Sequence, residues 1–380
     1  MRQHTTPTDS DALLSLIQQV TENYREPPLP LKRGKKRDFS ALSFLLLAVV
    51  AVTTRTFRDS ELHKLLEKDA CLRRSLDFAR LPHRTTIGRP LAGLVPEAEQ
   101  QIAALGSQIV AEVKPERDQP ELSAIDGRMY KTDGPAWHKK DREQGAIPRG
   151  LRNVDPESKW SKSGYRGWVQ GYRLVLQGLC FPEPIPVFAA WRPNHANEAQ
   201  IASEALGRSA LQVTDVLLGD QAFGGGDFPQ LYAAAGEWVL TPQQLPEERR
   251  SWKDDLYDYR KETIELLFQR IIQAAGLKQC QVKGAGRNGA YVLASVWLYQ
   301  ICFLAEYRAG KPLAHIKEQV DCARWRAVLR VLCFGYSTSL SKRAIANFNS
   351  PLAPGSWTLH FQGRVVAYKL FPARYKMSEQ

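Results

Sequence analysis

Residues 122–130 have the sequence LSAIDGRMY, in which apolar and polar residues alternate as in a β-strand. Two further strand-like segments follow, GYRLVLQGLCF at 171–181 and IPVFAAW at 185–191, the last after a proline turn. Consecutive strands with short connections predict an antiparallel meander. An acidic residue, Asp126, lies within the first of these strands.

The chain after this meander alternates between helices and strands. Apolar spacing predicts, in order, the helix NEAQIASEALG with Asn194 as its cap, the strand DVLLGD, the helix FPQLYAAAG, the strand EWVLTP and a long helix over 252–275. Three strands, then helix, strand, helix, strand and helix, is the element order of the ribonuclease-H-like fold. We therefore predict an α/β fold, a ribonuclease-H-like mixed sheet with flanking helices.

An all-helical N-terminal domain is predicted before this sheet, because helical spacing dominates from residue 9 to about residue 113. Its segment 81–91, LPHRTTIGRPL, offers Thr85 or Thr86 as a helix cap and carries Arg84 and Arg89. This short basic helix would either contact DNA or close a helical bundle. The predicted domains are 1–115, helical and DNA-binding; 116–308, catalytic; and 309–380, a basic C-terminal extension.

Composition indicates the class of partner. Lys and Arg number 52 against 40 Asp and Glu, a net charge of +12 that suits a polyanion such as nucleic acid. The 6 cysteines form no CxxC pair, so we expect reduced thiols and no zinc site. The N-terminus lacks the apolar core of a signal peptide, and the longest apolar run, 44–52, is far shorter than the roughly 20 residues of a membrane span. We expect a cytoplasmic, nucleoid-associated protein with no membrane contact.

Three acidic residues are candidates for a metal site. Asp126 and Asp220 follow or lie in strands that are neighbours in this topology, so their side chains should face one cleft. On the long helix, apolar neighbours should direct Glu265 toward the sheet, whereas Glu262 should project outward. Carboxylate oxygens hold hard cations, and two Mg (or Mn) ions about 3.5–4 Å apart stabilise phosphodiester attack.

Four blocks carry a family resemblance: AIDGRMYK, DPESKWSKSGYRGWVQGYRLVL, VLLGDQAFGGGDF and YRKETIELLFQRI. In this order they resemble the DDE transposases of bacterial insertion sequences, the insertion sequence four/five-like superfamily, in the branch with a Tyr, Arg, Glu, Lys signature. The helical region before them is similar too, so the resemblance covers roughly 40–305. It implies that Asp126, Asp220 and Glu265 bind two divalent metals, which activate water to nick DNA and then a 3' hydroxyl to join it to target DNA.

The signature departs from the family around Glu265. The family spacing places its Arg at Lys261 instead of Arg260, its Tyr at Asp258, and its Lys at Ile272. A second basic segment, 159–173, interleaves aromatic residues and would either grip DNA or form a hairpin with its aromatics in the core. The predicted DNA contacts are Arg84, Arg89, Lys159, Lys162, Arg166, Arg173, Tyr257, Arg260, Lys261 and Arg270.

The sequence thus predicts a DNA transposase that acts on double-stranded element ends and target DNA, as a homodimer when DNA is bound. Two alternatives remain: a nuclease of the same fold that only hydrolyses, and a transposase-derived DNA-binding protein whose acids no longer bind metal. Gly284, Gly286 and Gly289 form a GxGxxG pattern, but no buried strand precedes it. We interpret these glycines as part of a basic loop that could touch phosphate.

Overall fold

The 380-residue chain is described by a computed structural model over residues 21–25, 39–113, 120–147, 151, 153–164, 166–235, 237–242, 258–310, 356–361 and 364–369. It divides into two compact units, Met1–Val328 and Leu329–Gln380. In the second unit, β7 (Ser356–Phe361) and β8 (Arg364–Lys369) pair in antiparallel fashion. Most of the predicted extension 309–380 lies outside the described residues, and the three domain boundaries stay predictions.

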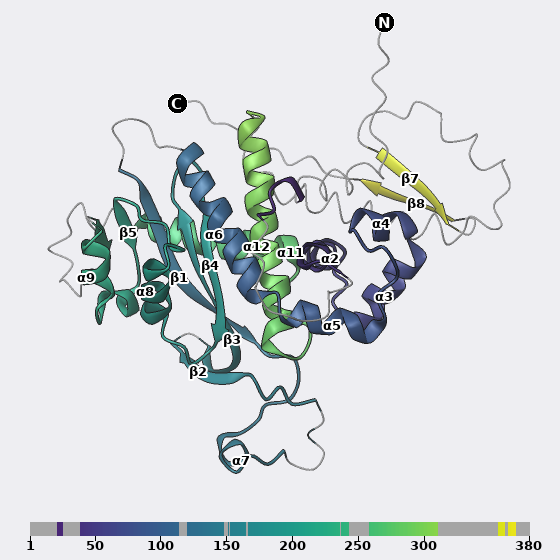
Figure 1. Ribbon diagram of the computed structural model, residues 1–380, viewed down its shortest axis with the longest axis horizontal. Coiled ribbons are helices and arrows are strands. Elements are labelled where there is room, and N and C mark those ends of the chain that lie inside the picture. The colour runs from purple at the N-terminus through teal and green to yellow at the C-terminus, as the bar shows by residue number, and fades with distance from the viewer. Residues whose placement is uncertain are drawn as a thin grey trace, which may run out of the picture. The chain divides into compact units, whose positions relative to one another are not determined.

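A mixed six-stranded sheet lies in the first unit (Figure 1). Its strands are β1 (Leu122–Lys131), β2 (Lys159–Ser163), β3 (Gly167–Leu179), β4 (Ile185–Pro193), β5 (Val216–Leu218) and β6 (Trp238–Leu240). β1, β3 and β4 pair antiparallel, and β5 and β6 continue the sheet in parallel from the other edge of β1. The predicted mixed sheet with the ribonuclease-H-like element order is therefore confirmed. β2 is additional, and it makes the basic and aromatic segment a hairpin with β3.

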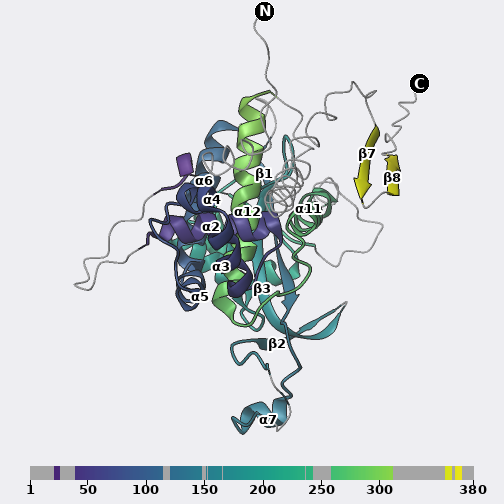
Figure 2. The ribbon, with the colours of Figure 1, turned by 90° about the vertical axis from the view of Figure 1, so that its right-hand side faces the viewer.

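Helices cover both faces of this sheet. The helices described over their whole length are α2 (Ala41–Thr54), α3 (Asp59–Lys68), α4 (Ala70–Ser75), α5 (Arg84–Ala92), α6 (Val95–Glu112), α7 (Lys139–Glu143), α8 (Glu198–Gly207), α9 (Phe228–Ala233), α11 (Leu266–Ala275) and α12 (Ala285–Arg308), with the short turns η1 (Gln221–Gly224) and η3 (Lys261–Glu265). One apolar layer joins α6, α12 and α11 to α2 and α5, and a second lies under α8 and α9. The N-terminal helices thus share one continuous core with the sheet, as Figure 2 shows where they lie against α12.

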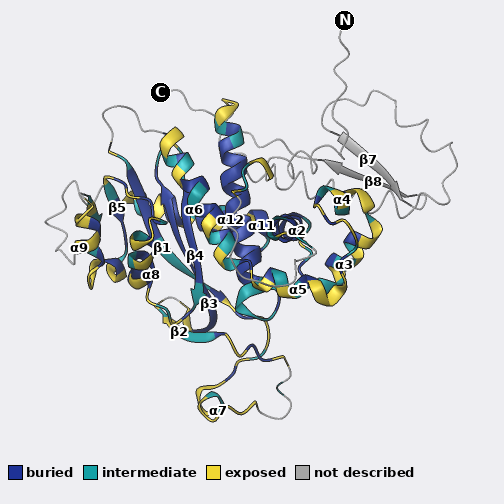
Figure 3. Ribbon diagram, viewed as in Figure 1, coloured by how far each residue is buried: buried dark blue, intermediate teal, exposed yellow. Residues whose placement is uncertain are grey.

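α12 is the central helix of the first layer. It is long and apolar enough to cross a bilayer, yet 94% of its most apolar window is buried inside the protein. Figure 3 shows the helix as buried along most of its length, with exposed residues mainly at its end. Its apolarity is therefore explained by contacts with α2, α6 and β4.

The GxGxxG glycines begin α12 and serve close packing. A side chain at Gly286 or Gly289 would overlap neighbouring atoms, and Gly284 has a φ of 93°, which glycine adopts readily. The first amides of the helix, those of Gly284 and Ala285, donate to carboxylates of Asp155 and Glu157 at 3.0 and 2.6 Å. These amides are therefore already occupied and do not form a phosphate-binding nest.

Two helix caps differ from the predictions. α8 begins after Asn197, whose side chain accepts a backbone hydrogen bond at 3.2 Å, whereas Asn194 is buried at the end of β4. α5 begins after His83, whose ring nitrogen accepts from the amide of Thr85, so neither Thr85 nor Thr86 caps it. In both cases the capping side chain belongs to the residue directly before the first helical residue, where it can reach the open first-turn amides.

Candidate metal centre

Asp126 and Asp220 lie where two neighbouring strands separate. β5 pairs in parallel with the start of β1 and ends at Leu218, which lies opposite Ala124. Asp126 is two residues further along β1, beyond the last paired residue of β5, and Asp220 caps the turn η1 that leads the chain away. The parallel edge of β1 is therefore uncovered at Asp126, and both carboxylates meet at this strand end.

A third carboxylate reaches the same point from α8. Glu198 is the first residue of that helix and only 8% exposed, and one oxygen each of Glu198, Asp126 and Asp220 lie within 4.8 Å of one another. Gly127 makes room for it, because a Cβ at this position would overlap the Glu198 carboxylate. Glu198 has no signature in the sequence, since an acid in the first turn of a helix is common and is favoured by the helix dipole.

Two arginines hold these carboxylates. Arg260 lies 2.8 Å from Oδ2 of Asp126, and buried Arg173 lies 2.9 Å from Oε1 of Glu198. The second oxygen of Asp126 accepts from a backbone amide at 2.7 Å, and Asp220 accepts from another at 2.9 Å. Each of the three acids thus has at least one fixed polar partner, which orients the cluster.

Burial and mutual repulsion favour the protonated forms of two of these acids. Desolvation raises the pKa of Glu198 to about 7, although Arg173 opposes the shift. The nearby charges of Asp220 and Asp126 raise it further. Desolvation also raises the pKa of Asp126 against its ion pair, with contributions from Asp220 and Glu265. A cation placed among the carboxylates would relieve this repulsion.

Glu265 lies at the exposed rim of the cluster. It is the last residue of η3, a single π-helical turn that runs into α11, and such turns are frequent at functional sites. Its charge contributes to the raised pKa of Asp126, so Glu265 lies close enough to this acid to act on it electrostatically. It is nevertheless outside the group of acids whose oxygens lie within 4.8 Å, and Glu262 is exposed as well. Its role as the third metal ligand stays a prediction.

The donor set fits a hard divalent cation. Carboxylate oxygens are the ligands that Mg²⁺ prefers in proteins, and three of them converge here. Arg173 and Arg260 together offset only part of the negative charge of the three acids. Glu265 adds a fourth carboxylate nearby. Because Gly127 has no side chain, there is also room for the Glu198 carboxylate beside β1.

The residues predicted to contact DNA fall into two groups. Those at least partly exposed are Arg84, Arg89, Lys159, Lys162, Arg166 and Lys261. Those engaged in ion pairs are Arg173 with Glu198, Arg260 with Asp126, and Arg270 with Glu183. Tyr257 lies outside the described residues. The paired arginines are engaged with acidic side chains in this structure. Of the two groups, the first is therefore the one whose side chains are open to solvent.

No family model and no curated protein matches this sequence. Among solved structures, the chain is similar to a piggyBac transposase in a synaptic complex with hairpin DNA, with a TM-score of 0.40 and 11% sequence identity over 93% of this chain and 85% of that chain. At this degree of similarity, the function is better judged from the carboxylate cluster itself.

Proposed function

We propose that this chain is a DNA transposase that cleaves phosphodiester bonds with divalent cations and joins the released 3' ends to target DNA. The observation that carries the proposal is the convergence of Asp126, Asp220 and Glu198 within 4.8 Å at the end of a parallel strand pair. The ordered blocks that resemble DDE transposases and the net charge of +12 support a DNA substrate.

In this proposal Asp126 and Asp220 hold the cations, and Glu198 or Glu265 completes the ligand set. Two Mg²⁺ or Mn²⁺ ions would neutralise charge on the attacking and leaving oxygens. The chain's own part is to keep the acids converged: Arg173 holds Glu198 in place, and backbone amides hold the two aspartates.

The arginine contacts favour a second candidate, a DNA-binding protein derived from a transposase. Arg260 occupies Oδ2 of Asp126, and a backbone amide occupies the other oxygen. A metal ion at Asp126 therefore has to displace Arg260. If the ion pair between Arg260 and Asp126 persists in the presence of the metal, the protein would bind DNA without cutting it.

Cleavage of duplexes from the DNA that flanks this chain's own gene separates these candidates. The wild type should cut them with Mg²⁺ or Mn²⁺ and lose cutting with EDTA, while Asp126→Asn and Asp220→Asn should lower the rate by about 10³-fold or more. Lys68→Ala, at an exposed helix end, serves as the control.

A second arm adds a circular target to pre-cut ends that carry a free 3' hydroxyl. Joined products support the transposase, whereas cutting without joining identifies a nuclease that only hydrolyses. DNA binding with no metal-dependent cutting contradicts the proposal and supports the second candidate.

A further inference from the structure

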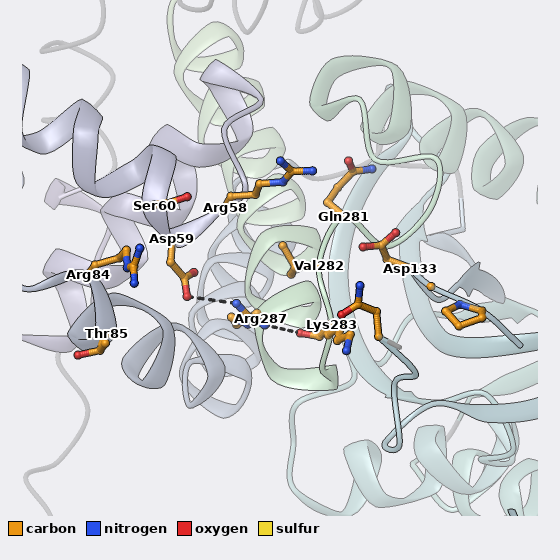
Figure 4. Close-up of a pocket in the computed structure, with 13 residues that line it drawn as sticks. Arg58, Asp59, Ser60, Arg84, Thr85, Asp133, Gln281, Val282, Lys283 and Arg287 are labelled. Carbon is orange, nitrogen blue, oxygen red and sulfur yellow. Dashed lines mark hydrogen bonds and ion pairs between the residues drawn. The ribbon is translucent and has the colours of Figure 1, made fainter. Parts of the chain in front are cut away.

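A cleft of about 630 Å³ lies just beyond the end of β1. Figure 4 shows Arg58 and Arg84 on the side of the N-terminal helices, at the starts of α3 and α5. Asp133, which follows β1, and the segment that precedes α12 lie on the opposite side. Arg287 of α12 lies between the two walls. The cleft thus joins parts of the chain that are far apart in sequence.

The charge of the cleft is mainly positive. Its basic residues are Arg58, Arg84, Lys283 and Arg287, and its acidic residues are Asp59 and Asp133. Arg287 lies 3.2 Å from Asp59 and so offsets that acid. Within the described part of the chain, neither Arg84 nor Lys283 forms an ion pair, and Arg58 approaches only the exposed Glu61, at 3.9 Å. Three basic side chains are therefore available to an anion.

The neutral residues of the cleft add hydrogen-bond donors. Ser60 contributes a hydroxyl group and Gln281 contributes an amide, whereas the Thr85 hydroxyl lies 2.9 Å from the ring nitrogen of His83 and is already engaged. Arginine, lysine, hydroxyl and amide donors are the groups that contact nucleic-acid phosphates. Among the described residues that line the cleft there is no aromatic ring on which a base would stack. This lining suits a phosphate backbone better than a nucleotide bound by its base.

The position of the cleft relates it to the carboxylate cluster. Asp126 alternates along β1 with Ala124 and Tyr130, which belong to the core layer under α5 and α12, so it faces the same side of the sheet as the cleft. The strand from Asp126 to Lys131 spans about 17 Å, and the nearest lining residue of the cleft along the chain, Asp133, follows two residues later. That length corresponds to about five nucleotides of a DNA strand.

We propose that the cleft binds backbone phosphates of the DNA about five nucleotides from the bond that the carboxylate cluster cuts. The inference rests on the proposed function for its substrate, since it takes DNA as the polyanion. Arg84 and Lys283 make direct contacts from opposite walls, while Arg58 adds charge at the entrance.

Binding of the full chain to labelled duplex DNA, measured by fluorescence anisotropy in EDTA over a range of salt concentrations, tests the cleft. The double variant Arg84→Ala/Lys283→Ala should bind about tenfold more weakly and lose about 2 from the slope of log K against log salt. The control pair Lys68→Ala/Arg208→Ala removes the same charge from exposed helix ends outside the cleft and should bind as the wild type does. Arg84→Lys should keep most of the affinity, and the melting temperatures of all variants should be unchanged.

Wild-type affinity in the double variant, or an equal loss in the control pair, overturns the proposal. So does displacement of the DNA by micromolar inorganic phosphate or mononucleotide, which would identify a small-anion site. The outcome is separate from the proposed function. If DNA binding depends on the cleft residues but no metal-dependent cutting occurs, the transposase proposal is refuted and the cleft proposal is supported. If cutting occurs but DNA binding does not depend on the cleft residues, the cleft proposal is refuted and the transposase proposal is supported.

Discussion

The carboxylate cluster and the basic cleft lie along the same strand, β1, but differ in how their charges are held. In the cluster, Asp126 and Glu198 are bound to Arg260 and Arg173, and their positions are set by buried contacts. In the cleft, Arg84 extends from an exposed helix start and forms no ion pair with any described residue. Fixed, crowded acids suit a small cation that needs defined ligand geometry, whereas exposed bases such as Arg84 suit a long polyanion that can bind in several registers.

The largest expected effect concerns which acid is the third ligand of the cluster. Glu198→Gln should weaken Mn²⁺ binding by about 10- to 100-fold or more, since even outer-shell changes cost that much. Glu265→Gln should weaken it less, because Glu265 lies outside the group within 4.8 Å. Titration calorimetry or Mn²⁺ spin resonance gives both affinities, and neither change should alter DNA binding in EDTA. A larger loss of Mn²⁺ affinity in Glu265→Gln than in Glu198→Gln would identify Glu265 as the third metal ligand.

A methyl group added at Gly127 would fill the space next to Glu198 and so tests how tightly the cluster is packed. Gly127→Ala places a methyl group on the Glu198 carboxylate and should cost about 1–3 kcal/mol of unfolding free energy, along with metal affinity. Gly225→Ala is the matched control, because a Cβ there meets nothing within 4 Å. Chemical denaturation measures both variants. Equal stability of the two would mean that the Glu198 carboxylate can move away from the added methyl group.

The pH dependence of stability should come from the cluster and not from the cleft. The pKa of Glu198 is raised to about 7 in the folded chain, against an ordinary value of 4.5. Its contribution to stability is therefore fully present below pH 4.5 and is lost as the pH rises through 7. Without metal, the melting temperature should fall by a few degrees over this window, and less so in Glu198→Gln. An unchanged slope in the variant would contradict the assignment.

The smallest expected effect concerns Arg260, which competes with a cation for Asp126. Arg260→Ala should tighten Mn²⁺ binding several-fold, because it removes a positive charge from the centre. Arg270→Ala is the control, since its ion pair is with Glu183. Metal affinity measured by calorimetry decides the matter. Weaker binding in Arg260→Ala would show that the arginine orients Asp126 for the metal instead of opposing it.

Apart from β2 and the short helix α7, the sequence by itself determined the order of strands and helices from β1 to α11, and it placed Asp126 and Asp220 on neighbouring strands. Both follow from local information, because the alternation along β1 and the short apolar run of β5 are visible in a few consecutive residues. The helix that carries Glu265 was predicted in the same way, from its apolar spacing. The caps at Asn197 and His83 were missed, because several neighbouring polar residues can cap a helix and only the backbone decides between them.

Only the tertiary structure decided what surrounds the two aspartates. Glu198, Arg173 and Arg260 reach the strand end from α8, β3 and the segment before η3, and the packing of the whole sheet brings them together. The same holds for the cleft, whose bases come from the N-terminal helices and from the start of α12. Ion pairs between distant segments leave no periodic pattern in the sequence, because each partner alone resembles an ordinary surface charge.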